Sequence, residues 1–246
     1  MKKYAVLLSG GINHSNNYER YENDLELAYR VLKEVGFYDD NILLFFGNGM
    51  KCIENVKVIP KAAKKEDIID CFNKLAYQLN EEDELVLVVS NHGGNERGGT
   101  ICLWENADIE LSHLAEFLNN IKARKIVILG ECYGGNILKY DILNSCIFTA
   151  NEQGKPSYAH IIPSRKTFLY DEFIYHFFSY IAARYPDTGN RIPQGSNNLI
   201  EAYRYAKEND IFNPDNQRGI EIRINDERVV EIPQMKNNLT DAITIL

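Results

Sequence analysis

Two short motifs carry the side chains with the clearest potential for covalent catalysis. His92 is followed by two glycines, and Cys132 is followed, after one residue, by two more. A Cys with a nearby His is a nucleophile with its proton acceptor. Gly93 lacks a side chain that would block a backbone N–H facing a developing oxyanion, and the Cys132 N–H is a natural second donor. We therefore expect His92 and Cys132 to form a dyad that cleaves an acyl bond.

Each motif directly follows a run of apolar, β-rich residues. Residues 84–90 lead into His92, and residues 125–129 lead into the Cys132 motif. Runs of this kind are typical of parallel strands that are buried on both faces. Further runs of the same type lie at 4–9, 41–46 and 145–150. Because the carboxyl ends of parallel strands face one crevice, neighbouring strands would bring His92 and Cys132 into a common volume.

Amphipathic segments separate these runs. They predict helices at 22–35, 66–79, 110–121, 171–184 and 198–209. Strands and helices that alternate with short connections are typical of an α/β fold built from right-handed crossovers. We predict a mainly parallel central sheet between helical layers and a C-terminal hairpin of residues 219–225 and 229–232. The stretch 185–197, rich in Pro and Gly, is interpreted as a surface loop, so that residues 1–246 form a single domain.

The composition excludes several classes of protein. The 246 residues hold 27 Lys and Arg against 35 Asp and Glu, a net charge of −8 with a pI near 5.2, which argues against a nucleic-acid partner. The longest apolar runs fall far short of the roughly 20 residues that a membrane-spanning helix needs, and the apolar stretch after Lys3 is too short for a secretion signal. The five cysteines form no zinc-type cluster with histidine. We expect a cytoplasmic protein with reduced thiols, no membrane contact, and no metal or organic cofactor.

The Cys132 motif has a second interpretation. Residues 130–134 fit the G-x-nucleophile-x-G turn that occurs in α/β-hydrolases and in glutamine-cleaving amidotransferases. Both classes need a His after the Cys, here His160 or His176, and spacing identifies no Asp or Glu partner for either. This interpretation also leaves the motif around His92 unexplained. A packing role for Cys132 is the remaining alternative, since cysteine is among the most frequently buried residues.

The two motifs resemble the catalytic His-Gly and Ala-Cys-x-Ser-Gly of the legumain (asparaginyl endopeptidase, hemoglobinase) cysteine peptidases. Three further segments resemble the same family: residues 17–29, in which Arg20 matches a substrate-pocket Arg; residues 149–159, a strand and substrate loop that includes Ser157; and residues 167–173, in which Asp171 matches a second pocket residue. The resemblance implies a caspase-like, three-layer αβα sandwich and cysteine endopeptidase activity on peptide or protein substrates.

Four positions depart from the family's motifs. Glu131 and Gly134 stand where the family has alanine and serine, and Asn91 replaces the Asp before the catalytic His. Tyr133 stands where legumains have an acidic pocket residue after the catalytic Cys, so that a substrate pocket with Tyr133 would be less negative. The changes at positions 91 and 133 bear directly on specificity for asparagine.

The predicted substrate pocket centres on Arg20. A guanidinium is a fixed cation with a planar donor fork, which suits a carboxylate or amide oxygen, and Asp171 would either orient it or accept a hydrogen bond from a substrate amide N–H. We expect cleavage after Asn or Asp. Taken without the resemblance, Arg20 would be interpreted as an exposed residue at a helix start, paired with Glu22 or Asp24.

The resemblance implies peptide hydrolysis through an acyl-enzyme. Cys132 attacks, the amides of Gly93 and Cys132 hold the oxyanion, and His92 protonates the leaving amine. Resolution of the acyl-enzyme by an amine would give ligation instead, and a catalytically silent caspase-like scaffold is the non-enzymatic alternative. We expect no large inhibitory pro-segment. Control by an activating partner, by an effector, or by a nick in loop 94–99 or 151–157 stays open.

Overall fold

Five parallel strands and one antiparallel edge strand form the central sheet of the computed structural model, which describes residues 1–161, 168–216, 221, 223–224 and 226–239. The strand order is β11-β8-β7-β3-β1-β2, and only β11 runs antiparallel to its neighbour. The bounds of these strands are β1 Lys3–Ser9, β2 Ile42–Phe46, β3 Glu84–Val89, β7 Arg124–Leu129, β8 Ser145–Thr149 and β11 Gln234–Asn237. The five predicted parallel strands are confirmed.

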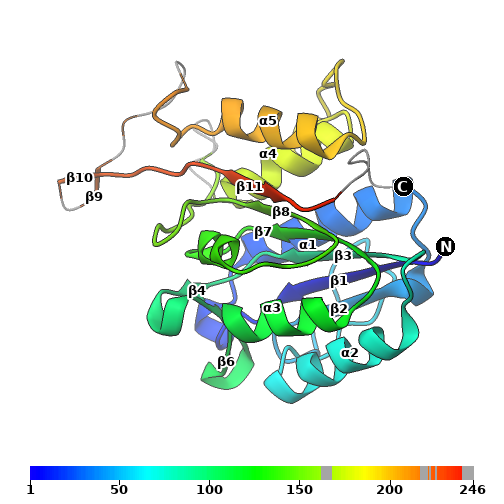
Figure 1. Ribbon diagram of the computed structural model, residues 1–246. Helices are drawn as coiled ribbons and strands as arrows, with labels where there is room; N and C mark the ends of the chain where they lie inside the picture. The colour runs from blue at the N-terminus through cyan, green and yellow to red at the C-terminus, as the bar shows by residue number, and fades with distance from the viewer. Residues whose placement is uncertain (162–167, 217–220, 222, 225, 240–246) are drawn as a thin grey trace.

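Helices cover both faces of the sheet, so that the molecule has three layers (Figure 1). Alternating side chains of β3 divide the interior: Val86 and Val88 face one core with α1, α4 and α5, whereas Leu85 and Leu87 face a second core with α2 and α3. This alternation explains why β3 is apolar throughout. The helices are α1 Glu19–Glu34, α2 Lys65–Gln78, α3 Leu111–Asn120, α4 Glu172–Ile181 and α5 Leu199–Asn209, which confirms the five predicted helices.

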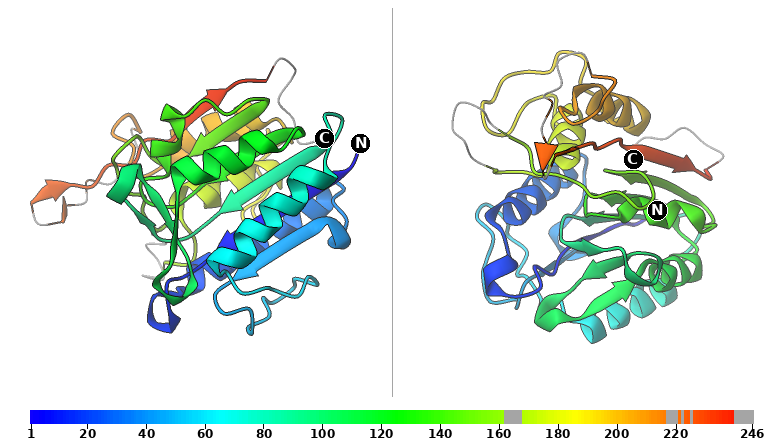
Figure 2. Two further views of the ribbon diagram at one scale, coloured as in Figure 1. Left: turned by 60° about the horizontal axis from the view of Figure 1, so that its bottom comes forward. Right: turned by 90° about the vertical axis from the view of Figure 1, so that its left-hand side faces the viewer.

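A small antiparallel sheet follows β3 on the side where the parallel strands end (Figure 2). Its strands are β4 Gly93–Gly94, β5 Thr100–Cys102 and β6 Asp108–Glu110. This sheet could not be predicted from the sequence, because strands of two or three residues leave no periodic pattern. Short 3-10 turns complete the chain at His14–Asn16, Asp39–Asn41, Glu96–Gly98, Trp104–Asn106 and Gly134–Lys139.

The C-terminal segment differs from the predicted hairpin. The described part of the hairpin pairs β9, Arg223–Ile224, with β10, Glu227–Arg228, so the second arm begins two residues earlier than predicted. Residues 219, 220, 222 and 225 of the predicted hairpin lie outside the described residues. The chain then returns as β11 and pairs with β8, an edge strand that the sequence analysis did not predict.

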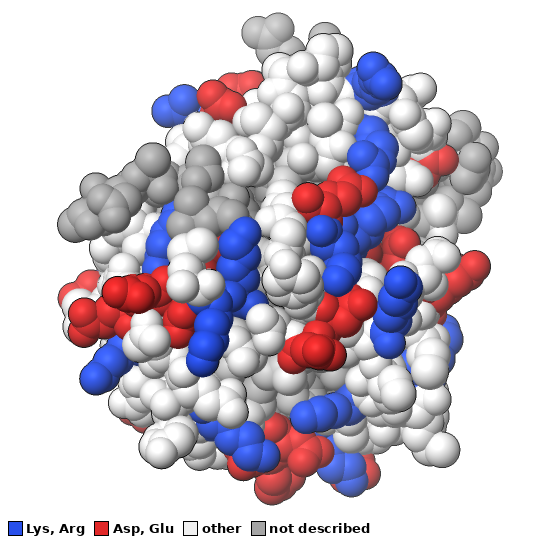
Figure 3. Space-filling model, turned by 90° about the vertical axis from the view of Figure 1, so that its right-hand side faces the viewer, with Lys and Arg blue, Asp and Glu red and all other residues white. Residues whose placement is uncertain are grey.

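Charge and hydropathy of the described residues agree with the composition. On the face in Figure 3, Lys and Arg side chains are interspersed with Asp and Glu. No helix in the described part of the chain is long and apolar enough to cross a lipid bilayer. The five cysteines are free thiols, of which Cys71 and Cys146 are buried, Cys102 and Cys132 half-buried, and Cys52 exposed.

Candidate active site

The C-terminal ends of β3 and β7 bring the two chemically promising motifs together. These strands pair in parallel, and their last paired residues are Val89 and Leu129. His92 and Cys132 each lie three residues further along, so the two motifs leave the sheet side by side. Gly93 packs directly on the Cys132 backbone, because a Cβ built on Gly93 would stand 2.0 Å from the Cys132 carbonyl oxygen. Glycine is required for this approach.

The pairing of β4 leaves the Gly93 amide available. The Cys102 N–H donates to the His92 carbonyl at 3.1 Å, and Gly93 stands opposite Ile101 in the same antiparallel pair. Hydrogen-bonded and non-hydrogen-bonded pairs alternate along such a pair of strands, so the Gly93 N–H points away from β5. Among the described residues, no acceptor binds the Cys132 N–H either.

One hydrogen bond and two aromatic contacts hold the His92 ring. Its Nε2 lies 3.0 Å from the Asn16 carbonyl oxygen, and the rings of Tyr18 and Tyr21 lie edge-on with centroids 5.0 and 5.3 Å away. Because a carbonyl oxygen only accepts, Nε2 carries the hydrogen and Nδ1 keeps the lone pair of a base. Burial lowers the pKa of His92, the charge of Arg20 lowers it further, and the Asn16 hydrogen bond offsets part of this. The imidazole is therefore neutral at pH 7.

Three polar groups of Ser157 lie close to the sulfur of Cys132. The Ser157 N–H and hydroxyl lie 3.4 and 3.7 Å from Sγ, and the Ser157 carbonyl oxygen lies 3.5 Å from it. Burial raises the pKa of the Cys132 thiol, and the two Ser157 donors, which favour a thiolate, offset this only in part. Both side chains are therefore neutral at pH 7, and the site holds no thiolate–imidazolium ion pair.

Two buried asparagines connect the turns of the site. Asn91 accepts a hydrogen bond from the Gly11 N–H at 2.9 Å and donates one to the Cys102 carbonyl. Asn151 donates to the Glu131 carbonyl at 2.9 Å. The Asn91 side chain uses a donor and an acceptor at once, which an amide supplies and an ionised carboxylate does not. This requirement explains why an amide suits position 91.

The turn after Cys132 is tight and is clamped to the loop that follows β8. Tyr133 has a left-handed φ of 62°, and its N–H donates to the Lys155 carbonyl at 2.9 Å. At Gly135 an added Cβ would stand 2.3 Å from the Asn151 carbonyl oxygen. This clamp fixes the position of Ser157 against the thiol. Within the described residues, no contact joins Tyr133 to Arg20, the centre of the predicted pocket.

Arg20 is held in place from three sides. Its Nε donates to Asp171 at 2.8 Å, and one Nη donates to the Tyr21 hydroxyl at 3.0 Å. The guanidinium also lies over the Tyr18 and Tyr21 rings, 4.4 and 4.6 Å from their centroids. The alternative of an exposed Arg20 paired with Glu22 is wrong, because Glu22 pairs with Lys51. Two of the five guanidinium hydrogens are used by Asp171 and Tyr21, which leaves donors for a ligand.

A buried acid pair supports Arg20. The Ser90 hydroxyl lies 2.6 Å from Asp24 and 3.0 Å from Asp171, and the Asp171 N–H also points at Asp24. A hydroxyl has one hydrogen, so one of its two carboxyl partners must carry a proton. Burial raises the pKa of both Asp24 and Asp171, but the Arg20 ion pair lowers that of Asp171, so the proton belongs to Asp24. Asp171 is then the counter-charge of Arg20.

Glu131 is buried next to the thiol without a partner. Both of its carboxyl oxygens lack hydrogen bonds within the described residues, and its exposure is 0%. Burial raises the pKa of Glu131 to about 8; the backbone N–H of Glu131 itself acts to lower it, and the Asp171 charge adds a small further rise. At pH 7 the Glu131 carboxyl is therefore neutral.

Substitution Glu131→Gln should reduce the loss of stability with rising pH. The wild-type native state holds one more proton than the unfolded state between pH 4.5 and about 8, so its free energy of unfolding falls by up to ~1.4 kcal/mol per pH unit through this group. The variant lacks that contribution. Urea denaturation at several pH values from 5 to 8 measures the difference, and the exposed Glu116→Gln serves as control. A pH-independent difference between Glu131→Gln and wild type would show that Glu131 is ionised or partnered.

Sequence reasoning missed several residues that shape the site. Ser90 was not singled out, although it ends a predicted strand, and Asp24 was considered only as an exposed partner of Arg20, one helical turn away. The prediction that His160 and His176 lack an acidic partner is wrong, because Glu172 contacts both, Nδ1 of His160 at 2.5 Å and Nε2 of His176 at 3.1 Å. The i,i+4 spacing of Glu172 and His176 on α4 was the available signal.

Comparison with known proteins agrees with this architecture. A mainly parallel sheet flanked by helices, with a His motif and a Cys motif at adjacent strand ends, defines a protein of the caspase-like fold. The sequence model of the Peptidase C13 family matches residues 64–231, and the chain belongs to this family of legumain-like cysteine peptidases. The fold is similar to that of protein GSU0716 from Geobacter sulfurreducens, with a TM-score of 0.63 and 14% identity over 98% of this chain and 95% of that chain. No curated protein matches the sequence.

Proposed function

We propose that the chain is a cysteine endopeptidase in which Cys132 is the nucleophile and His92 the proton carrier. The observation that carries this proposal is the contact of Gly93 with the Cys132 carbonyl, since it puts the two motifs at one point of the sheet edge. The Gly93 N–H points away from β5, and no described acceptor binds the Cys132 N–H. Two available donors at this point support an oxyanion site beside the sulfur. We further propose one peptidase domain, because strands from both ends of the described chain, β1 and β11, share one sheet.

The proposed reaction starts from neutral groups. When a peptide binds, Sγ leaves its contacts with Ser157 and attacks the scissile carbonyl, while its proton passes to His92 Nδ1. The Gly93 and Cys132 amides stabilise the oxyanion of the tetrahedral intermediate. His92 then gives its proton to the leaving amine, and the acyl-enzyme forms. Water attacks the thioester with His92 as base, and collapse of the second intermediate returns the proton to the thiol and releases the acid.

We propose Asn or Asp as the P1 residue, the substrate residue before the scissile bond. Arg20 lies near His92, since its guanidinium packs on the Tyr18 and Tyr21 rings, and these two rings also contact the His92 ring. With Asp24 protonated, the pocket has one cation and one carboxylate, and the remaining Arg20 donors face no described acceptor. A side-chain amide or carboxylate oxygen is the complementary ligand.

Substitution Arg20→Lys tests the pocket. The ammonium keeps the charge that Asp171 needs but loses the planar fork, so kcat/KM for peptides with Asn or Asp at P1 should fall roughly 10- to 100-fold, as expected for loss of a charged hydrogen bond. Peptides with Leu at P1 should change much less. The control Arg30→Lys alters an Arg of the same helix that pairs with Glu26 instead. If the wild-type protein preferred peptides with Lys or Leu at P1, the proposed specificity for Asn or Asp would be wrong. The proposal that Cys132 is the nucleophile would not be affected.

A further inference from the structure

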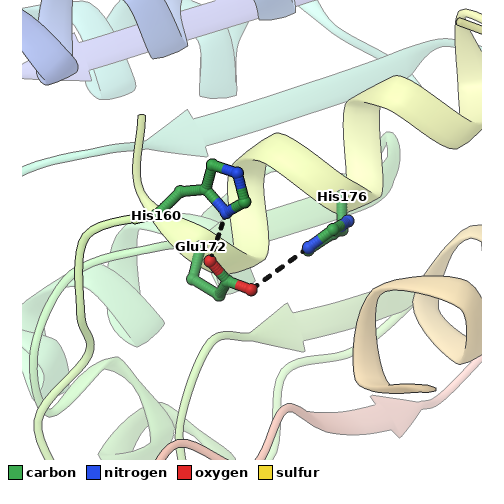
Figure 4. Close-up of side chains that lie close together, drawn as sticks. All are labelled: His160, Glu172 and His176. Carbon is green, nitrogen blue, oxygen red and sulfur yellow. Dashed lines mark hydrogen bonds and ion pairs between the residues drawn. The ribbon is translucent and has the colours of Figure 1, made fainter. Parts of the chain in front are cut away.

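A second cluster of ionisable side chains lies beyond the reacting groups, where α4 begins. His160, Glu172 and His176 point toward one another, and their nearest nitrogen and oxygen atoms all lie within 4.8 Å of each other (Figure 4). Glu172 lies between the two rings, 2.5 Å from His160 Nδ1 and 3.1 Å from His176 Nε2. No step of the proposed peptidase reaction uses these three side chains.

The cluster joins the substrate loop to α4. Ala159 and Asp171 form an antiparallel bridge, and the Glu172 N–H donates to the Tyr158 carbonyl at 3.0 Å. His160 therefore follows Ser157 by three residues on one side of the bridge, while Glu172 follows the Arg20 partner Asp171 on the other. Whatever binds the three side chains also holds the loop that contacts the Cys132 sulfur.

The surroundings of the cluster carry more acid than base. Glu172, Asp210 and Glu231 are each 0% exposed, and Asp210 and Glu231 each have one oxygen without a hydrogen-bond partner in the described part of the chain. The Ile211 N–H donates to the Glu172 carboxylate at 3.0 Å, and the Tyr158 N–H donates to the Glu231 carboxylate at 2.6 Å, so Asp210 and Glu231 lie beside the cluster. A bound cation would relieve this concentration of carboxyl groups.

The two ring nitrogens of His176 differ in their partners. Its Nε2 faces a carboxylate and must carry a hydrogen to bond it, which leaves Nδ1 as a bare lone pair. That Nδ1 is buried and has no partner among the described residues, in a side chain that is 7% exposed. If Nε2 instead bound a cation, the hydrogen would move to Nδ1, which faces no described acceptor, so the cation alone would fix this tautomer.

We propose that His160 Nδ1, the Glu172 carboxylate and His176 Nε2 form a binding site for a divalent transition metal of the Zn²⁺ type. Two imidazole nitrogens and one carboxylate oxygen are a recognised zinc ligand set that leaves a fourth position open. Metal–ligand bonds of about 2.0–2.1 Å in tetrahedral geometry put ligand atoms ~3.3 Å apart, close to the 3.1 Å between His176 Nε2 and Glu172. Imidazole ligands favour Zn²⁺, Co²⁺ or Ni²⁺ over Ca²⁺ and Mg²⁺, which prefer oxygen.

The proposed metal would act on structure and not on the reacting atoms. It would replace two hydrogen bonds by three coordinate bonds that join residue 160 to the first two turns of α4. Because the native state would bind the metal and the unfolded chain would bind it weakly, saturating metal should raise the melting temperature of the full chain. This consequence does not depend on peptidase activity.

Titration of the untagged full-length chain with ZnCl₂ by calorimetry, and with CoCl₂ by absorption, tests the site. We expect one equivalent to bind, and we expect His160→Ala and His176→Gln each to weaken binding at least ~100-fold. The exposed His113→Ala on α3 should bind like wild type. Cobalt also distinguishes the ligands, since a thiolate ligand such as Cys132 gives an intense charge-transfer band that a site of two His and one Glu lacks.

Three results would overturn the proposal. These are absence of saturable binding up to millimolar metal, affinity that survives both His substitutions, and a thiolate-type cobalt spectrum. Absence of binding in wild type would mean that the three side chains form an ion-pair network only. Circular dichroism and thermal unfolding without metal identify any variant that fails to fold, and His160→Ala, whose side chain is 13% exposed, is the more tolerant of the two changes.

Discussion

The variant His92→Ala should lose roughly 10²–10⁴-fold in kcat, the contribution typical of a general acid and base. The loss should be this large because Cys132 holds its proton: burial raises the pKa of the thiol and lowers that of His92, so no preformed ion pair supplies a thiolate. Attack on the substrate therefore needs a base at the moment of reaction. Steady-state kinetics on the preferred peptide measures the effect, and KM should change little.

A rescue experiment separates the chemistry of His92 from its packing. The ring occupies a space between Tyr18, Tyr21 and the Asn16 carbonyl, and imidazole added to His92→Ala can enter that space and restore part of the rate. The exposed His113→Ala is the matched control and should keep wild-type kinetics. A wild-type kcat in His92→Ala, or an unchanged rate of acyl-enzyme formation on Cys132, would contradict the assigned role of His92.

The variant Gly93→Ala should lose activity and stability together. An added Cβ would stand 2.0 Å from the Cys132 carbonyl oxygen and 3.1 Å from Glu131 Cγ, so the ends of β3 and β7 must separate. Overpacking of this kind costs about 1–3 kcal/mol. Displacement of the Gly93 N–H from the oxyanion site should reduce kcat by roughly 10²–10³-fold, the effect of losing one such donor.

Comparison with Gly189→Ala distinguishes a local effect from general strain. Gly189 has φ of 70° and nothing within 4 Å of an added Cβ, so alanine there costs only backbone strain, about 1 kcal/mol, and should leave kcat unchanged. Urea denaturation and kinetics on both variants make the comparison. Activity near wild type in Gly93→Ala would contradict an oxyanion site at this amide.

Most of the sheet and its helices could be predicted because burial leaves a pattern in the sequence. The apolar runs of β3 and β7 are continuous since both faces of each strand are covered. The same runs placed His92 and Cys132 at neighbouring strand ends. The strands β4 to β6 could not be predicted, as two or three residues carry no period, and β11 borders only one neighbour and is half exposed along its length.

The sequence pattern could not predict contacts between segments that lie far apart along the chain. Arg20 and Asp171 are 151 residues apart, and only the family resemblance pointed to that pair. Nothing in the spacing predicted that Ser157 would surround the Cys132 sulfur, or that Glu131 would be buried without a partner. Glu172 and His176 were within reach of the helical i,i+4 rule, but His160 joins them through a loop whose path the sequence does not specify.

Intact mass spectrometry tests the nucleophile most directly. Wild type and Cys132→Ala are exposed to peptidyl electrophiles with Asn, Asp, Lys or Leu at P1. We predict a single adduct on wild type, fastest with Asn or Asp, and none on Cys132→Ala, although Cys52 is the most exposed of the five thiols. Adducts of equal mass and rate on both proteins, or labelling of Cys52 in place of Cys132, would contradict Cys132 as the catalytic nucleophile.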